Sequence, residues 1–186
     1  MQHSYPVKIK DIRKETSDCV SIAFDIPPDL KEIFHFKPGQ YINIIKEVAG
    51  EELHRSYSLC CSPEDKEWRV AVKKMYGGKF SVYANESLKA GDLVELMPPN
   101  GKFTSLIQSG QNKNYLFIAA GSGITPVMSL IRSILQVEKE SSISLLYGNS
   151  TTNHIIFRDN ILDIKNQYLN RFQVHFILSR EMMEEA

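Results

Sequence analysis

The stretch from Tyr115 to Val137 limits the possible folds more strongly than any other part of the sequence. Residues 115–120 form an uninterrupted apolar run, which is typical of a strand buried on both faces of a parallel sheet. A glycine-rich turn, residues 121–126, follows at once, and residues 127–137 then carry apolar side chains at helical spacing. The pattern continues with a strand at 143–147, a helix at 155–168 and a strand at 172–178. This alternation predicts half of a doubly wound parallel sheet.

The chain before Leu106 has a different pattern, in which short apolar stretches alternate with turn residues. Candidate strands lie at residues 7–12, 19–26, 40–45, 55–60, 68–73 and 93–97, and one helix at 81–88 interrupts them. This number of short strands is enough to close a small antiparallel barrel. We therefore expect an α+β protein of two domains. Residues 1–108 would form an antiparallel Greek-key β-barrel, and residues 112–186 would form part of a doubly wound parallel α/β domain.

Composition excludes several classes of protein. The formal net charge is zero and 24% of residues are charged, so nothing draws the chain to nucleic acid or to an anionic membrane. The N-terminal residues lack the apolar core of a secretory signal, and no apolar run is long enough to span a membrane, so we expect a cytoplasmic location. Cys19, Cys60 and Cys61 have no metal-ligand spacing, which indicates reduced, half-buried thiols and no metal site.

The first candidate site is Arg55-Ser56-Tyr57-Ser58, at the end of a predicted strand. It offers a cation, an aromatic ring and a hydroxyl within four residues. A flavin needs such a set: charge for its pyrophosphate, a ring against its isoalloxazine and a hydrogen-bonding group near N5. The alternative is that Tyr57 is a core residue and that Arg55 and Ser58 are solvated.

The second candidate site is Gly77-Gly78-Lys79-Phe80-Ser81, which leads into the predicted helix. Glycines allow close approach of the backbone, and a helix N-terminus presents free N–H groups and its positive dipole end to an anion. The alternative is that Ser81 simply caps a surface helix.

The third candidate site is the turn Gly121-Ser122-Gly123-Ile124-Thr125-Pro126. It lies between a strand and a helix, where a parallel sheet places its phosphate-binding turn. It departs from the GxGxxG pattern, because Pro126 stands where the third glycine would be. A plain strand-to-helix turn is the alternative.

Taken together, the motifs occur in a specific order. RxYS is followed by GGxFS, by GDxxExxPPxGxF and by GSGITP after an apolar strand, and this series resembles the ferredoxin–NADP reductase superfamily over essentially the whole chain. Within it, the chain resembles the reductase components of phenylacetate-degradation (phenylacetyl-CoA epoxidase) systems, and next the reductase modules of flavohemoproteins. The stretches that carry the first likeness are GGKFSVYAN at 77–85, LKAGDLVELMPPNGKF at 88–103, LYGN at 146–149, IIFR at 155–158 and LSRE at 178–181.

The resemblance implies FAD as a cofactor and assigns a role to each motif. Arg55 would meet the pyrophosphate, Tyr57 would lie against the isoalloxazine and Ser58 would hydrogen-bond near N5, so that Tyr57 and Ser58 are the expected catalytic residues. Further residues expected to bind FAD are Ser56, Val72, Lys73, Gly77, Gly78, Lys79, Phe80 and Ser81.

The resemblance also implies that NADPH or NADH binds at the third motif. Gly121, Ser122, Gly123, Thr125 and Pro126 would let the dinucleotide lie close to the sheet and would aim nicotinamide C4 at flavin N5. Ser179 and Arg180 follow the last strand, where related reductases bind the 2′-phosphate of NADP, and this favours NADPH slightly. Ser150 stands where relatives often carry an arginine.

The expected function is transfer of hydride from NAD(P)H to FAD, followed by release of single electrons to an iron–sulfur domain, a ferredoxin, a flavodoxin or an oxygenase partner. By the same resemblance, the last strands of the nicotinamide domain and a [2Fe–2S] domain are missing, so turnover by this chain alone is expected to be impaired. Two other functions stay open. One is a flavin-free or degenerate binding or regulatory module, and the other is a small barrel that binds single-stranded nucleic acid, which the zero net charge disfavours.

Overall fold

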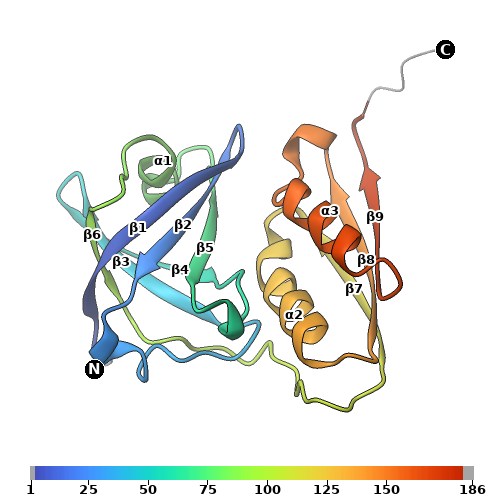
Figure 1. The fold of residues 1–186 in the computed structure, drawn as a ribbon. Helices are drawn as coiled ribbons and strands as arrows, with labels where there is room; N and C mark the ends of the chain where they lie inside the picture. The colour runs from blue at the N-terminus through green and yellow to red at the C-terminus, as the bar shows by residue number, and fades with distance from the viewer. Residues whose placement is uncertain (1–2, 182–186) are drawn as a thin grey trace.

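The computed structural model describes residues 3–181, which form two units side by side (Figure 1). The first unit is one antiparallel sheet in the order β4-β3-β6-β1-β2-β5. Its strands are β1 (Tyr5–Thr16), β2 (Cys19–Asp25), β3 (Tyr41–Val48), β4 (Glu51–Ser58), β5 (Trp68–Lys73) and β6 (Leu93–Leu96). A bridge between Leu59 and Val70 joins the segment after β4 to β5, so the two outer strands meet and the sheet curls into a barrel.

The barrel interior is filled by side chains that alternate along the strands. Ile22, Ile42 and Val72 are all no more than 1% exposed and belong to one apolar cluster. Helix α1 (Lys79–Glu86) closes one end, because Phe80 and Ala84 on one of its faces enter the same cluster.

The second unit is a parallel sheet in the order β7-β8-β9 with two helices. It runs through β7 (Asn114–Ala120), the 3-10 turn η3 (Gly121–Gly123), α2 (Ile124–Val137), β8 (Ser142–Asn149), η4 (Thr152–His154), α3 (Arg158–Gln167) and β9 (Phe172–Leu178). Both helices lie on the face of the sheet that is turned toward the barrel (Figure 1). The expected fold class, an antiparallel barrel followed by half of a doubly wound sheet, is confirmed.

The two units share apolar contacts. Cys19, Cys60 and Ala71 of the barrel belong to the same buried cluster as Ile124 and Met128 of α2. All three cysteines are free thiols and fully buried, whereas the sequence predicted half-buried ones. Burial raises the pKa of the Cys19 thiol to about 12, so this thiol stays protonated at neutral pH.

Five predicted boundaries were wrong by more than two residues; two of these are the end of β3, at Val48 and not residue 45, and the start of α2, at Ile124 and not residue 127. Strand β1 continues to Thr16 because its polar residues face outward and two irregularities in its register keep it paired with β2. Strand β4 begins at Glu51 and pairs along its whole length with β3. Helix α3 begins at Arg158 and not at residue 155, because Phe157 has a left-handed φ of 62° and the buried Ile155 and Ile156 precede it.

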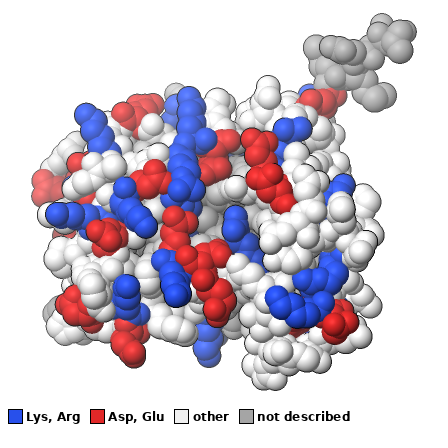
Figure 2. Space-filling view, viewed as in Figure 1, with Lys and Arg blue, Asp and Glu red and all other residues white. Residues whose placement is uncertain are grey.

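Charges of both signs are interspersed over the face of the molecule in Figure 2, in keeping with the zero net charge. Among residues 3–181, no helix has the length and apolar character needed to cross a membrane.

Candidate active site

A cavity of about 500 Å³ lies between the barrel and the second unit, and the three candidate motifs meet in its walls. Four segments that are far apart in the sequence contribute: the end of β4, β5 with the loop after it, the start of α1, and the turn before α2. The cavity is lined by Arg55, Ser56, Tyr57, Ser58, Ala71, Lys73, Met75, Gly78, Lys79, Phe80, Ser81, Ser122, Gly123, Thr125 and Pro126. It lies at the carboxyl edge of the parallel sheet, because the turn directly follows the C-terminal end of β7.

The end of β4 supplies a cation and an aromatic ring. Arg55 is exposed and donates one hydrogen bond, from Nη1 to the carbonyl of His54 at 2.8 Å, so the rest of its guanidinium can meet a ligand. Tyr57 is half-buried, and its ring centroid lies 5.7 Å from that of Phe80. Burial raises the pKa of Tyr57 to about 12, so its hydroxyl stays neutral at physiological pH. Ser58, half-buried, ends the strand beside it.

The start of α1 presents a helix N-terminus to the cavity. Gly78 is the N-cap, so the helix begins at Lys79, two residues earlier than predicted. Ser81 is therefore not a cap. Its buried hydroxyl instead accepts a hydrogen bond of 3.1 Å from the backbone N–H of Met75, which ties the preceding loop to the helix. The N–H groups of the first helical turn have no partner within the helix and lie at the cavity wall.

A glycine is needed at position 78 because a larger residue would clash with its neighbours, and not because of the backbone conformation there. A Cβ atom on this residue would lie 2.4 Å from Ser81 Oγ and 3.2 Å from the carbonyl oxygen of Met75. Gly77, which does not line the cavity, has a φ of 71° and makes the turn itself. Lys79 forms an ion pair with Glu51, so part of its charge is already compensated.

Strand β5 shows one error in the residue prediction. Val72 is 0% exposed and points into the barrel core, so its side chain does not line the cavity. Neighbouring residues of a strand face opposite sides, and the cavity side therefore carries Ala71 and Lys73, followed by Met75 in the loop. Ala71 and Met75 were missed; alternate spacing from Lys73 was the signal that could have found them. Lys73 also pairs with Asp18 at 3.5 Å.

The turn before α2 is held from within the second unit. The Thr125 hydroxyl donates to the carbonyl of Ser122 at 3.0 Å, and the Tyr147 hydroxyl donates to the carbonyl of Gly121 at 2.9 Å. Gly121 itself does not line the cavity, but its φ of 49° allows the turn. A Cβ atom on Gly123 would meet nothing within 4 Å, so the backbone there faces open space. The buried Tyr147 is a supporting residue that the motifs did not reveal.

Ser179 and Arg180 lie outside the cavity. They follow β9, and their N–H groups donate to the carbonyls of Asn149 at 3.0 Å and Ser150 at 2.8 Å. Both are exposed, at the same edge of the parallel sheet as the turn. Glu181 lies at this edge too, and its carboxylate accepts hydrogen bonds from the N–H and the hydroxyl of Thr152.

These groups fit a flavin and a nicotinamide nucleotide better than a metal. The cavity combines two aromatic side chains, Tyr57 and Phe80, with the guanidinium of Arg55 and the amides of a helix N-terminus. Flat rings pack on aromatic side chains, and phosphates bind guanidinium groups and free amides. Within residues 3–181, no three His, Cys, Asp or Glu side chains gather where they could hold a metal ion.

Comparison with known proteins agrees with a site for a flavin and a nicotinamide nucleotide. Residues 6–105 match the model of the oxidoreductase FAD-binding domain, and residues 117–185 match that of the oxidoreductase NAD-binding domain. The chain is 41% identical to a subunit of the 1,2-phenylacetyl-CoA epoxidase of Escherichia coli (strain K12), over 97% of this chain and 51% of that protein. It is 31% identical to the ferredoxin reductase component of 3-ketosteroid-9-alpha-monooxygenase of Rhodococcus rhodochrous, over 96% of this chain and 50% of that one.

The fold also matches solved structures. Ferredoxin-NADP+ reductase from Plasmodium falciparum superposes with a TM-score of 0.80 at 22% identity, over 96% of this chain and 75% of that one. The chain thus spans about half the length of the two curated relatives named here. The resemblance expected from the order of the motifs is confirmed: the chain belongs to the family of FAD- and NAD-binding oxidoreductases with the ferredoxin–NADP+ reductase fold.

Proposed function

We propose that this chain is the FAD- and NAD(P)H-binding part of an electron-transfer reductase. Its FAD-binding unit is residues 1–108 and its NAD(P)-binding unit is residues 112–186. One observation carries the proposal: Arg55–Ser58, Gly78–Ser81 and the turn residues Ser122, Gly123, Thr125 and Pro126 line a single cavity between the two units. A hydride donor and a flavin must lie in contact, and one cavity shared by both units provides for that contact.

On this proposal the barrel residues hold FAD. Arg55 and the first amides of α1 bind the pyrophosphate, where Ser81 keeps the preceding loop fixed through Met75. Tyr57, supported from behind by Phe80, packs against the isoalloxazine ring. Because Tyr57 stays neutral, it adds no charge beside the flavin. Ser58 supplies a hydroxyl near N5, and Tyr57 and Ser58 are the catalytic residues.

The residues of the second unit orient the nicotinamide nucleotide. Ser122, Gly123, Thr125 and Pro126 form the wall on which it lies, and the open space above Gly123 lets it approach the backbone. Bound FAD accepts two electrons as hydride and can pass them on one at a time. The protein's own contribution is to hold the two cofactors in line, since this transfer needs no general base.

The electron acceptor is proposed by class. One relative is named as a subunit of an epoxidase and another as the ferredoxin reductase component of a monooxygenase. We therefore propose an oxygenase component, a ferredoxin, a flavodoxin or an iron–sulfur domain as the acceptor. We favour NADPH over NADH because Arg180 and Ser179 are exposed at the edge of the sheet where the nucleotide would end.

The test is spectroscopic. The purified chain is titrated with FAD while the visible flavin bands are recorded, and NADPH or NADH is then added without oxygen. We expect FAD to bind at one site and its oxidised band to bleach. A protein that stays colourless with excess FAD would overturn the flavin site and favour a flavin-free binding or regulatory module. Binding without bleaching would show that this chain alone does not transfer hydride.

A further inference from the structure

Helix α2 presents one polar row to the barrel. Ser129, Arg132, Ser133 and Gln136 are spaced so that they share one face of the helix, although this helix is otherwise largely apolar. Each of them contacts the short barrel segment of residues 61–65, between the end of β4 and β5. We call these contacts the α2 seam.

Ser129 is the first residue of the α2 seam along the helix. It is 0% exposed, and its hydroxyl donates to the carbonyl of Cys61 at 2.6 Å. The same oxygen accepts a longer hydrogen bond, 3.4 Å, from the N–H of Gly39. One hydroxyl of the second unit thus bridges two separate loops of the barrel.

Ser133 and Gln136 extend the α2 seam by one helical turn. The Ser133 hydroxyl lies 3.1 Å from the hydroxyl of Ser62, and both residues are buried. Gln136 Nε2 donates to Asp65 Oδ1 at 2.8 Å. Asp65 is fixed in turn, because its other oxygen accepts from the N–H of Ser62 at 2.9 Å.

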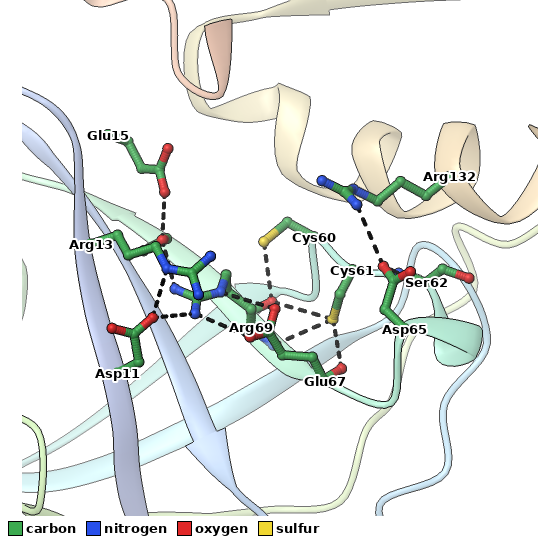
Figure 3. Close-up of polar contacts among 11 residues, drawn as sticks. Asp11, Arg13, Glu15, Cys60, Cys61, Ser62, Asp65, Glu67, Arg69 and Arg132 are labelled. Carbon is green, nitrogen blue, oxygen red and sulfur yellow. Dashed lines mark hydrogen bonds and ion pairs between the residues drawn. The ribbon is translucent and has the colours of Figure 1, made fainter. Parts of the chain in front are cut away.

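Arg132 is a partly exposed member of the row and pairs with Asp65. Its Nη1 lies 3.7 Å from Asp65 Oδ2, and Figure 3 shows this side chain reaching from α2 toward Asp65, beside Cys61 and Ser62. The pair is partly exposed, and we expect it to matter less than the buried hydroxyl contacts.

Two cavities lie beside the contact between the two units. The candidate active site lies on one side, and a second cavity of about 380 Å³, which includes Arg13, Arg69 and Glu67, lies between the units as well. Helix α2 lines both, through Thr125 and Pro126 in the first and Met128 and Arg132 in the second. Ser129 lies between Met128 and Arg132 in the sequence, three residues after Pro126.

We propose that the α2 seam sets the position of the nicotinamide-binding turn relative to Tyr57 and Ser58, and that Ser129 and Ser133 are positioning residues for hydride transfer. The inference rests on the function proposed above. Apolar contacts between the units are non-directional, so they permit small rotations, whereas paired hydroxyl and carbonyl groups fix one orientation. The turn directly precedes α2, so any tilt of the helix about Ser129 moves the turn within the cavity.

The experiment compares Ser129→Ala and Ser133→Ala, singly and together, with Ser144→Ala as the matched control. Ser144 lies on β8, away from the barrel segment. Spin labels are attached to cysteines introduced at the exposed Lys89 of the barrel and Asn170 of the second unit, since the native cysteines are buried. The distribution of label-to-label distances is measured by double electron–electron resonance. Circular dichroism checks that each variant is folded.

We expect the double variant to broaden the distance distribution and Ser144→Ala to leave it unchanged. With FAD bound, the rate of flavin bleaching at saturating NADPH should fall about tenfold, since small misplacements of reacting groups are costly. The affinity for FAD should change less than about twofold, because Ser129 and Ser133 do not line that cavity. If Ser129→Ala does not fold, Ser133→Ala and Gln136→Ala carry the same comparison.

An unchanged distance distribution in the folded variants would overturn the proposal. So would a broadened distribution with an unchanged bleaching rate, because the seam would then fix the units without affecting hydride transfer. If the parent chain does not bind FAD, the proposed function fails; if it binds FAD without bleaching, this chain alone does not transfer hydride. The distance measurement then still decides whether the α2 seam fixes the two units.

Discussion

The hydroxyl of Tyr147 donates a hydrogen bond of 2.9 Å to the carbonyl oxygen of Gly121. Tyr147 lies in the middle strand of the parallel sheet and is 0% exposed, whereas Gly121 begins the turn that lines the cavity. The sheet interior thereby holds the turn in place before any ligand arrives. Burial raises the pKa of this phenol well above its usual value, so the donor is present at every pH of interest.

Removing this donor should loosen the turn and weaken nicotinamide binding. We expect Tyr147→Phe to lose about 0.5–1.5 kcal/mol of turn stability, the usual value of one hydrogen bond, and to weaken NADP+ binding several-fold. FAD affinity should stay the same, because the barrel is untouched. Titration of the FAD-loaded protein with NADP+ measures both. The control is Tyr115→Phe, which loses a hydroxyl bonded to Glu138 at 3.0 Å elsewhere in the unit; equal effects of the two variants would refute the prediction.

A methyl group at Gly78 should block the flavin site without straining the backbone. The φ of Gly78 is −78°, which alanine adopts freely, but its Cβ would lie 2.4 Å from Ser81 Oγ. Ser81 must then move and release the N–H of Met75. We expect Gly78→Ala to weaken FAD binding by about tenfold or more, measured by flavin fluorescence quenching. Gly148→Ala is the control, because its nearest new contact would be an ordinary 3.8 Å.

Arg55 should contribute charge to FAD binding. Because its guanidinium is exposed and has only one hydrogen-bond partner among the described residues, it is free for the pyrophosphate. Loss of a hydrogen bond to a charged group costs about 1.5–3 kcal/mol, so Arg55→Ala should weaken FAD binding by about 10- to 100-fold. Affinity should also depend less on salt in this variant. Arg158→Ala, which removes an exposed arginine paired with its neighbour Asp159, should change neither quantity.

The sequence identified the motifs that line the cavity, but it did not identify all of the residues around them. The glycine turns and RSYS are recognisable because glycines before a helix, or an arginine and a tyrosine at a strand end, are unusual. The order of these motifs along the chain identifies the family. Val72 was assigned to the cavity together with Lys73, although adjacent strand residues face opposite sides. The structure places Val72 in the core and gives the cavity wall to Ala71. The alternation of side chains along the strand could have predicted that Ala71, and not Val72, faces the cavity.

Contacts between the units could not be predicted in the same way. Ser129 and Ser133 lie among apolar residues of a helix, and nothing local distinguishes a serine that faces a neighbouring unit from one that bonds to its own helix. Ser133 in fact does both, since its hydroxyl also donates to the carbonyl of Ser129 at 2.8 Å. The partners Cys61 and Ser62 are about 70 residues away, and their proximity depends on how the barrel closes.

Low pH should remove the contribution that the Asp11–Arg69 ion pair makes to the stability of the fold. Arg69, almost fully buried, donates to Asp11 at 2.6 Å and also bonds Glu67 and Ser21. Figure 3 shows this arginine between the acids. The hydrogen bond from Arg69 keeps the pKa of Asp11 below its ordinary value of 3.8, although burial opposes the shift.

A carboxyl group whose pKa is lowered in the folded state stabilises the fold when the pH is above its unfolded value. This contribution should therefore be complete above about pH 5 and should disappear as the pH falls below 3.8 through the folded-state pKa. Urea unfolding of the chain and of Asp11→Asn at several pH values measures it. We expect the variant to be less stable at pH 7 and the difference to shrink toward pH 3. A difference that is independent of pH would contradict this origin.

Arg180 should decide between NADPH and NADH. A 2′-phosphate binds a guanidinium through paired hydrogen bonds, and Arg180 is exposed at the edge of the sheet, where the adenosine end of the nucleotide would lie. Its neighbour Glu181 has the opposite charge and is bonded to Thr152. Arg180→Ala should therefore raise KM for NADPH about tenfold and leave KM for NADH unchanged. Glu181→Gln should act in the opposite direction, lowering KM for NADPH, because it removes a negative charge near the phosphate. Anaerobic bleaching rates of the FAD-loaded protein, measured against the concentration of each nucleotide, give both constants. If Arg180→Ala raises both KM values equally, the arginine acts on the shared part of the nucleotide, and the preference for NADPH has no basis in this residue.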